Sequence, residues 1–186
     1  MRARISRRLR DRRGFSLGEL MLTLAILLLV TGMLANIIPV AKDVMDRTVD
    51  AANARTLLST TVTVLRDELS IAQRVEEKND TEVYYISGKT GAKNKIFPGA
   101  AGESIQIQEY LDRDGLSLAS DATRPLVSDA AATGELRTTY TGIAYNEANG
   151  VYEITGLQVV KNGNSVIGPM DLEIRNIQKK LAEGHH

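Results

Sequence analysis

The stretch RRGFSLGEL, at residues 12–20, joins a charged leader to a long apolar run. Seven arginines and a single acid, Asp11, lie in residues 1–13. The 22 residues from Leu20 to Ala41 then carry no charge. Since a bilayer core needs roughly 20 apolar helical residues, the sequence predicts a single membrane-spanning helix over residues 15–41. Positive residues that flank a first span stay on the cytoplasmic side, so we expect the N-terminus inside and residues 42–186 outside.

The net charge of zero hides an uneven distribution of charge along the 186 residues. Without residues 1–13, the chain keeps 16 basic and 22 acidic residues, a net charge of −6. An acidic body argues against binding to nucleic acid, because phosphate contacts need Lys and Arg to displace counterions. The chain has no cysteine, which excludes disulfides, Cys-based metal sites and thiol catalysis.

Three kinds of leader compete for this pattern. An ordinary secretory signal has an apolar core of about 7–15 residues and a cleavage site after it, and the run here is too long. A twin-arginine signal matches Arg12 and Arg13 but leaves Glu19 unexplained. The third kind is cut before the apolar run, and it accounts for Gly14 followed by Phe15 and Glu19.

Residues 7–40 resemble the type IV prepilin family, which includes the pseudopilins of type II secretion and competence systems. The match lies in Gly14, the aromatic Phe15, and Glu19 as fifth residue of the mature chain. The resemblance implies cleavage between Gly14 and Phe15 by a prepilin peptidase, N-methylation of Phe15, and filament assembly with other pilin or pseudopilin subunits on an assembly platform. It implies that Glu19 pairs with the Phe15 amine of a neighbouring subunit and so sets the stagger of the helices.

Elementary physics supports these roles. Gly14 has no side chain, so a peptidase can approach its backbone closely. A carboxylate in an apolar span costs about 2–3 kcal/mol on insertion scales and is by default a functional candidate. The alternative is that Glu19, one turn from the membrane edge, reaches the lipid headgroups.

Beyond the apolar run, residues 42–76 continue with helical periodicity. An apolar stripe with a phase slip near Arg55 predicts an amphipathic helix, packed on the chain's own C-terminal domain or, alternatively, in a coiled coil. Pro39 lies inside the helical pattern and predicts a kink. The stripe comprises Met45, Val49, Ala52, Leu58, Val62, Leu65, Leu69 and Ala72.

Residues 77–186 have the pattern of strands and loops. We expect strands at 82–86 and 104–111, loops at 87–102 and 112–134, and a three-stranded antiparallel meander from 136–146, 151–160 and 165–177, whose joins contain Asn-Gly. The fold class is therefore α+β, with a long N-terminal helix on an antiparallel sheet, and the resemblance implies the same pilin-like architecture. Expected core residues are Tyr140, Ile143, Tyr145, Val151, Ile154, Leu157 and Val159.

No catalytic constellation is recognisable, and we expect no enzyme activity, cofactor or metal. Residues 14–18 spell G-x-S-x-G, but a hydrolase elbow needs a preceding strand and a partner histidine. The sequence Asp112-Arg113-Asp114-Gly115, with Asp121, weakly matches the start of a calcium loop and lacks its closing glutamate. The alternative to a calcium loop is a solvated acidic turn.

The sequence therefore favours a structural subunit, a minor pilin or pseudopilin, held in the membrane and then assembled into a surface filament. The alternative is a single-pass membrane-anchored extracytoplasmic binding or sensor module. In that case the span only anchors, and Phe15 never becomes an N-terminus.

Overall fold

The computed structural model describes residues 16–128 and 135–178, and these form one helix and nine strands in an α+β fold, as predicted. Gly14 and Phe15, the predicted cleavage site, lie outside the described residues. The chain divides into two compact units, residues 1–47 and 48–186. The elements are α1 (Leu17–Leu69), β1 (Gln73–Asn79), β2 (Glu82–Ile86), β3 (Lys93–Phe97), β4 (Gln106–Tyr110), β5 (Leu118–Pro125), β6 (Leu136–Thr139), β7 (Gly142–Asn146), β8 (Val151–Lys161) and β9 (Asn164–Arg175).

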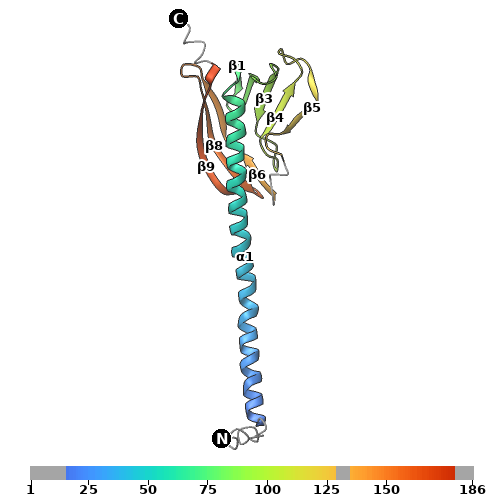
Figure 1. Cartoon of the computed structure of the whole chain (residues 1–186), viewed down its shortest axis with the longest axis vertical. Coiled ribbons are helices and arrows are strands. Elements are labelled where there is room, and N and C mark those ends of the chain that lie inside the picture. The colour runs from blue at the N-terminus through green and yellow to red at the C-terminus, as the bar shows by residue number, and fades with distance from the viewer. Residues whose placement is uncertain (1–15, 129–134, 179–186) are drawn as a thin grey trace, which may run out of the picture. The chain divides into compact units, whose positions relative to one another are not determined.

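The strands form two antiparallel sheets rather than one. The first sheet has the order β1-β2-β3-β4-β5. In the second sheet β8 pairs on one side with β6 and β7 in succession, and on the other side with β9. Figure 1 shows both sheets beside the C-terminal part of α1. The predicted meander is confirmed in β7-β8-β9.

The helix ends at Leu69, seven residues before the predicted end at Glu76. Residues from Gln73 onward pair instead with β2. The backbone carbonyls just beyond the helix find partners far along the chain: Ile177 donates its N–H to the Ser70 carbonyl at 2.7 Å, and the Asn176 side chain donates to the Ala72 carbonyl at 2.7 Å. Because helix ends leave carbonyls to be satisfied, this distant segment makes the early stop favourable.

Two predicted loops contain strands. The expected loop 87–102 contains β3, and the expected loop 112–134 contains β5. β3 is rich in Lys and Asn, which are not strand formers, yet it lies between β2 and β4 and bonds to both. The expected strand 136–146 is two strands in the structure, because β6 ends at Thr139 and β7 begins only at Gly142.

The two Asn-Gly joins differ in the structure. Asn162 and Gly163 have φ values of 51° and 79°, as a two-residue type I′ hairpin between β8 and β9 requires. The join before β8 is a longer loop, in which the Asn146 side chain accepts hydrogen bonds from the backbone N–H groups of Ala148 and Asn149. Both joins are therefore β-hairpins, and only the one between β8 and β9 is a two-residue type I′ turn.

The core of the unit 48–186 lies between the two sheets and one face of α1. Leu65 and Leu69 are fully buried against residues from both sheets, and Leu57 contributes to a second cluster with β6 and β8 residues. Five of the seven predicted core side chains in the meander are at most 5% exposed, and the other two are half-buried. The buried five are Tyr140, Ile143, Ile154, Leu157 and Val159, and the half-buried two are Tyr145 and Val151.

Candidate functional site

Glu19 lies in the first turn of α1 and already has a partner within its own chain. Its carboxylate oxygen Oε2 accepts a hydrogen bond from the backbone N–H of Ser16 at 3.1 Å. Ser16 precedes the helix, and its carbonyl accepts the N–H of Leu20 at 3.1 Å. Ser16 is therefore the N-cap and Glu19 is the third helical residue, the arrangement of a capping box.

This capping role was missed in the sequence analysis, although its signature is present. The residues S-x-x-E at 16–19 match the capping-box pattern that precedes an apolar run. A negative side chain in the first turn also interacts favourably with the helix dipole. Glu19 therefore has a local role that any proposal about assembly has to separate from an intermolecular one.

The apolar part of α1 is exposed in the unit 1–47. Every large apolar side chain from Leu17 to Val44 whose exposure is described is 45–79% exposed. Soluble monomers rarely expose contiguous apolar patches larger than roughly 300–600 Å². Among the described residues, α1 is the one helix that is long and apolar enough to cross a membrane.

The polar groups inside this apolar run are satisfied by the helix itself. The hydroxyl of Thr31 donates to the Leu27 carbonyl at 2.7 Å, and the hydroxyl of Thr23 donates to the Glu19 carbonyl. Such bonds to the preceding turn let a threonine lie in a medium without water, where unsatisfied polar groups are costly. The helix is continuous through Pro39, and the predicted kink there stays a prediction.

The phase slip in the apolar stripe separates two faces of the helix within the unit 48–186. Leu65 is buried, whereas Val49 is 47% exposed and Ala52 is exposed. Val49 and Leu65 are 16 residues apart, which at 100° per residue leaves them about 160° apart around the helix. The expected packing on the C-terminal domain therefore holds for the stripe from residue 58 onward, and Val49 and Ala52 lie on the outer face.

A buried polar cluster joins the end of α1 to the first sheet. The Glu68 carboxylate, in a residue 8% exposed, accepts hydrogen bonds from the Ser87 hydroxyl at 3.0 Å and from the Lys89 ammonium at 2.8 Å. The Asn94 amide donates to it at 3.4 Å. Burial, and next the charge of Glu68, raise the pKa of Tyr85 well above its ordinary value. The cluster fixes the helix on the sheet, and of its side chains only Lys89 is substantially exposed.

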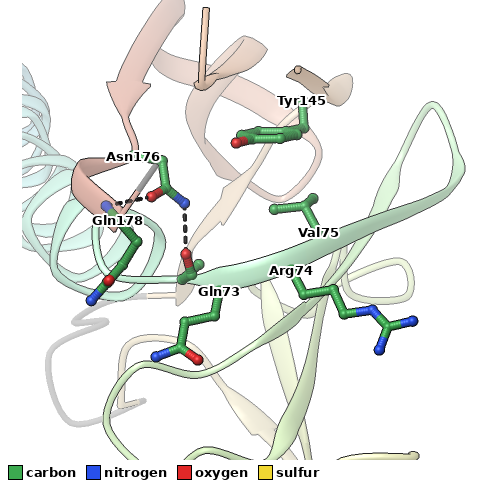
Figure 2. A pocket seen from close by; sticks show the side chains of 7 residues that line it. Gln73, Arg74, Val75, Tyr145, Asn176 and Gln178 are labelled. Atoms are coloured by element: carbon green, nitrogen blue, oxygen red, sulfur yellow. Dashed lines mark hydrogen bonds between the residues drawn. The ribbon is translucent and has the colours of Figure 1, made fainter. Parts of the chain in front are cut away.

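A hollow of 280 Å³ lies where β1 meets the residues that follow β9 (Figure 2). Figure 2 shows Val75 and Tyr145 on one side of β1, while Gln73 and Arg74 project from the other side, so the side chains do not converge on one point. Arg74 has φ of 43° at a β-bulge, which turns two consecutive side chains to the same side. The hollow therefore lacks the convergent polar groups of a ligand site.

The candidate calcium loop is held by its own hydrogen bonds. The two carboxylate oxygens of Asp112 accept the backbone N–H groups of Leu116 at 2.9 Å and Ser117 at 3.1 Å. Partial loss of water raises the pKa of Asp112, but these backbone bonds outweigh it, and the net shift is downward. Within residues 16–128 and 135–178, no group of three His, Asp or Glu is placed to hold a metal ion.

No family model, no curated protein and no solved structure matched the chain. The exposed apolar side chains of α1 and the Glu19 carboxylate in its first turn are the chemical features that a function has to explain.

Proposed function

We propose that this chain is a structural subunit of a type IV pilus, competence or type II secretion-like filament, of the minor pilin or pseudopilin kind. In this proposal a prepilin peptidase cuts between Gly14 and Phe15, and Phe15 is N-methylated. Before assembly, the mature chain is anchored in the cytoplasmic membrane with its N-terminus on the cytoplasmic side. It then joins other subunits on an assembly platform through the apolar part of α1 and reaches the cell surface.

The observation that carries the proposal is the exposure of α1. A helix whose large apolar side chains are 45–79% exposed over residues 17–44 needs lipid or other helices around it. In lipid the helix satisfies its own backbone, and in a filament the same surface packs against neighbouring helices. Cleavage before the helix, rather than after it, would leave this surface on the mature chain.

Glu19 supplies the charge in this proposal. A carboxylate near the membrane is costly when unpaired, and the new amine of a neighbour's Phe15 would neutralise it. Before cleavage, the Ser16 N–H holds the carboxylate at 3.1 Å, so the group is positioned at the helix start before it meets its partner.

The first test is the mature N-terminus in the native host, measured by mass spectrometry. We expect a chain that starts at methylated Phe15. A chain that starts at Met1, or beyond Gly32, would refute the proposal. The alternative function, an anchored binding or sensor module, predicts that Phe15 never becomes the N-terminus of the chain.

The second test separates the charge of Glu19 from its capping role. Glu19→Gln keeps an oxygen that can accept from Ser16, since Gln also serves in capping boxes, but it removes the charge. Glu19→Ala removes both. We expect both variants to be cleaved and inserted, and neither to enter filaments. If Glu19→Gln assembled normally and only Glu19→Ala failed, the carboxylate would act as a helix cap and the charge pairing would be wrong.

A further inference from the structure

Two arginines stand on one exposed flank of α1 in the unit 48–186. Arg55 and Arg66 are exposed, and neither makes an ion pair with a described residue. They are 11 residues apart, about 16 Å along the axis and within about 20° of the same side of the helix. Arg55 and Arg66 lie about 80° and 100° around the helix from Leu65, which packs into the core, so both stand on an exposed flank of α1. The small side chain of Ser59 lies between them and is exposed.

Two glutamates stand on the outer face of the second sheet. Glu153 on β8 lies directly opposite Glu173 on β9, and both are exposed. The residues on either side of Glu153, Tyr152 and Ile154, are buried in the core, so the glutamates point away from it. Like charges directly opposite destabilise a sheet. Arg175 is exposed two residues along β9 and offsets part of this charge, but neither glutamate makes an ion pair with a described residue.

We propose that the exposed flank of α1 that carries Arg55, Ser59 and Arg66 is a docking surface for a second copy of this chain. The acidic pair Glu153 and Glu173 of one copy enters between Arg55 and Arg66 of the next. The side chain of Ser59 is small enough to let the sheet approach the helix, so both glutamates come within reach of an arginine. This inference deepens the proposed filament and rests on it.

Charge complementarity within one chain selects a second copy as the occupant. The same molecule carries the basic pair and the acidic pair on surfaces that face away from one shared core. Two different patches in contact make a heterologous interface, which propagates into an open assembly when the rotation does not close. Exposed ion pairs are individually weak. Copies held in one membrane have a high effective concentration, so a weak contact suffices.

The chain has no cysteine, so introduced pairs can report the contact by disulfide cross-linking of the full chain in membranes. Ser59→Cys places a thiol between the two arginines. Ala144→Cys places one on β7, directly opposite Glu153 and exposed. The chain with both substitutions is expected to give a ladder of dimers, trimers and larger species after mild oxidation. Either single variant alone is expected to give no dimer, and a mixture of the two gives dimers only.

Charge reversal then tests the contact itself. Arg55→Glu with Arg66→Glu turns two attractive pairs into repulsive ones, which lowers the association constant by about thirtyfold. Glu153→Arg with Glu173→Arg is expected to do the same. The chain with all four reversals is expected to recover the ladder, because complementarity returns with opposite sign. All four positions are exposed, so folding is expected to be retained.

Three results would overturn the inference: no ladder, a dimer from a single-cysteine chain, or a ladder unaffected by charge reversal. A dimer from a single-cysteine chain would indicate a symmetric contact between identical patches. A ladder unaffected by charge reversal would indicate a contact to which these four charges do not contribute. The proposed function is judged separately, from the mature N-terminus and from filament formation by the unmodified chain. If the Arg55→Glu, Arg66→Glu chain formed filaments as well as the unmodified chain, this docking surface would be wrong and the proposed function would be unaffected.

Discussion

Replacing Glu68 by alanine removes the acceptor at the centre of the buried cluster between α1 and the first sheet. The Ser87 hydroxyl at 3.0 Å and the Asn94 amide at 3.4 Å then lose the oxygen to which they donate. Ser87 and Asn94 are buried, at 1% and 3% exposure. Water therefore does not readily replace the lost carboxylate oxygen as their acceptor. Lys89 is less affected, because its side chain is 53% exposed.

The cost can be built from these contacts. Loss of the Ser87 hydrogen bond costs about 1 kcal/mol, and leaving two buried donors without an acceptor adds about 1–2 kcal/mol. The half-exposed pair with Lys89 adds at most about 0.5 kcal/mol after screening. Glu68→Ala is therefore expected to lower the free energy of unfolding by about 3 kcal/mol. Glu68→Gln keeps an oxygen for Ser87 and Asn94 but loses the charge and the acceptor of the half-exposed Lys89, so about 1 kcal/mol is expected.

Urea unfolding of the full chain in detergent micelles measures this, with tyrosine fluorescence as the signal. The chain has no Trp, and its six tyrosines all lie between Tyr84 and Tyr152, so the signal reports the unit 48–186. With a urea dependence of about 2 kcal/mol/M, Glu68→Ala lowers the midpoint by about 1.5 M. Asp67→Ala, at the exposed neighbouring position, is the control and should change stability by less than about 0.5 kcal/mol. If Glu68→Gln were as costly as Glu68→Ala, or Glu68→Ala cost less than about 1 kcal/mol, the hydrogen-bond account would be wrong.

Two further predictions use the same assay. Leu65→Ala is expected to cost about 3 kcal/mol through a core cavity, and Val49→Ala, on the outer face, less than about 0.5 kcal/mol; equal costs would contradict the assignment of the two faces. The hydrogen bond from Lys93, and then its charge, lower the pKa of Glu76 below its ordinary 4.5. The stability contributed by Glu76 is therefore present above pH 4.5 and is lost as the pH falls through the lowered pKa. Glu76→Gln should flatten the decline of stability below pH 4.5, and superimposable pH profiles for the two chains would refute this pairing.

Much of the fold follows from local pattern. The uncharged run from Leu20 to Ala41 is too long and too uniformly apolar for an ordinary core helix, and α1 includes all of it. The alternation in residues 151–160 predicts β8, and Asn162-Gly163 predicts its hairpin to β9, because a type I′ turn needs positive φ at both positions. Such signals depend only on residues near one another in the sequence.

The two strands that the sequence did not predict share a physical cause. β3 and β5 are polar segments whose strand conformation comes from hydrogen bonds to neighbouring strands, and local composition does not report such partners. The capping contact between Ser16 and Glu19 is a different case, because its S-x-x-E signature is local and could have been predicted.

The sequence by itself determined that one apolar helix precedes a β-rich domain, and that a single carboxylate stands at the start of that helix. These follow from hydropathy, charge and short-range periodicity, which act between residues within a few positions of each other. Only the tertiary structure decided which face of α1 is buried. It also showed that the Ser87 hydroxyl donates a hydrogen bond to Glu68. Asn176 and Ile177 donate to backbone carbonyls just beyond the end of α1. Those outcomes depend on contacts between residues 107 positions apart, Ser70 and Ile177, and 111 positions apart, Asp50 and Lys161. No local pattern encodes such contacts.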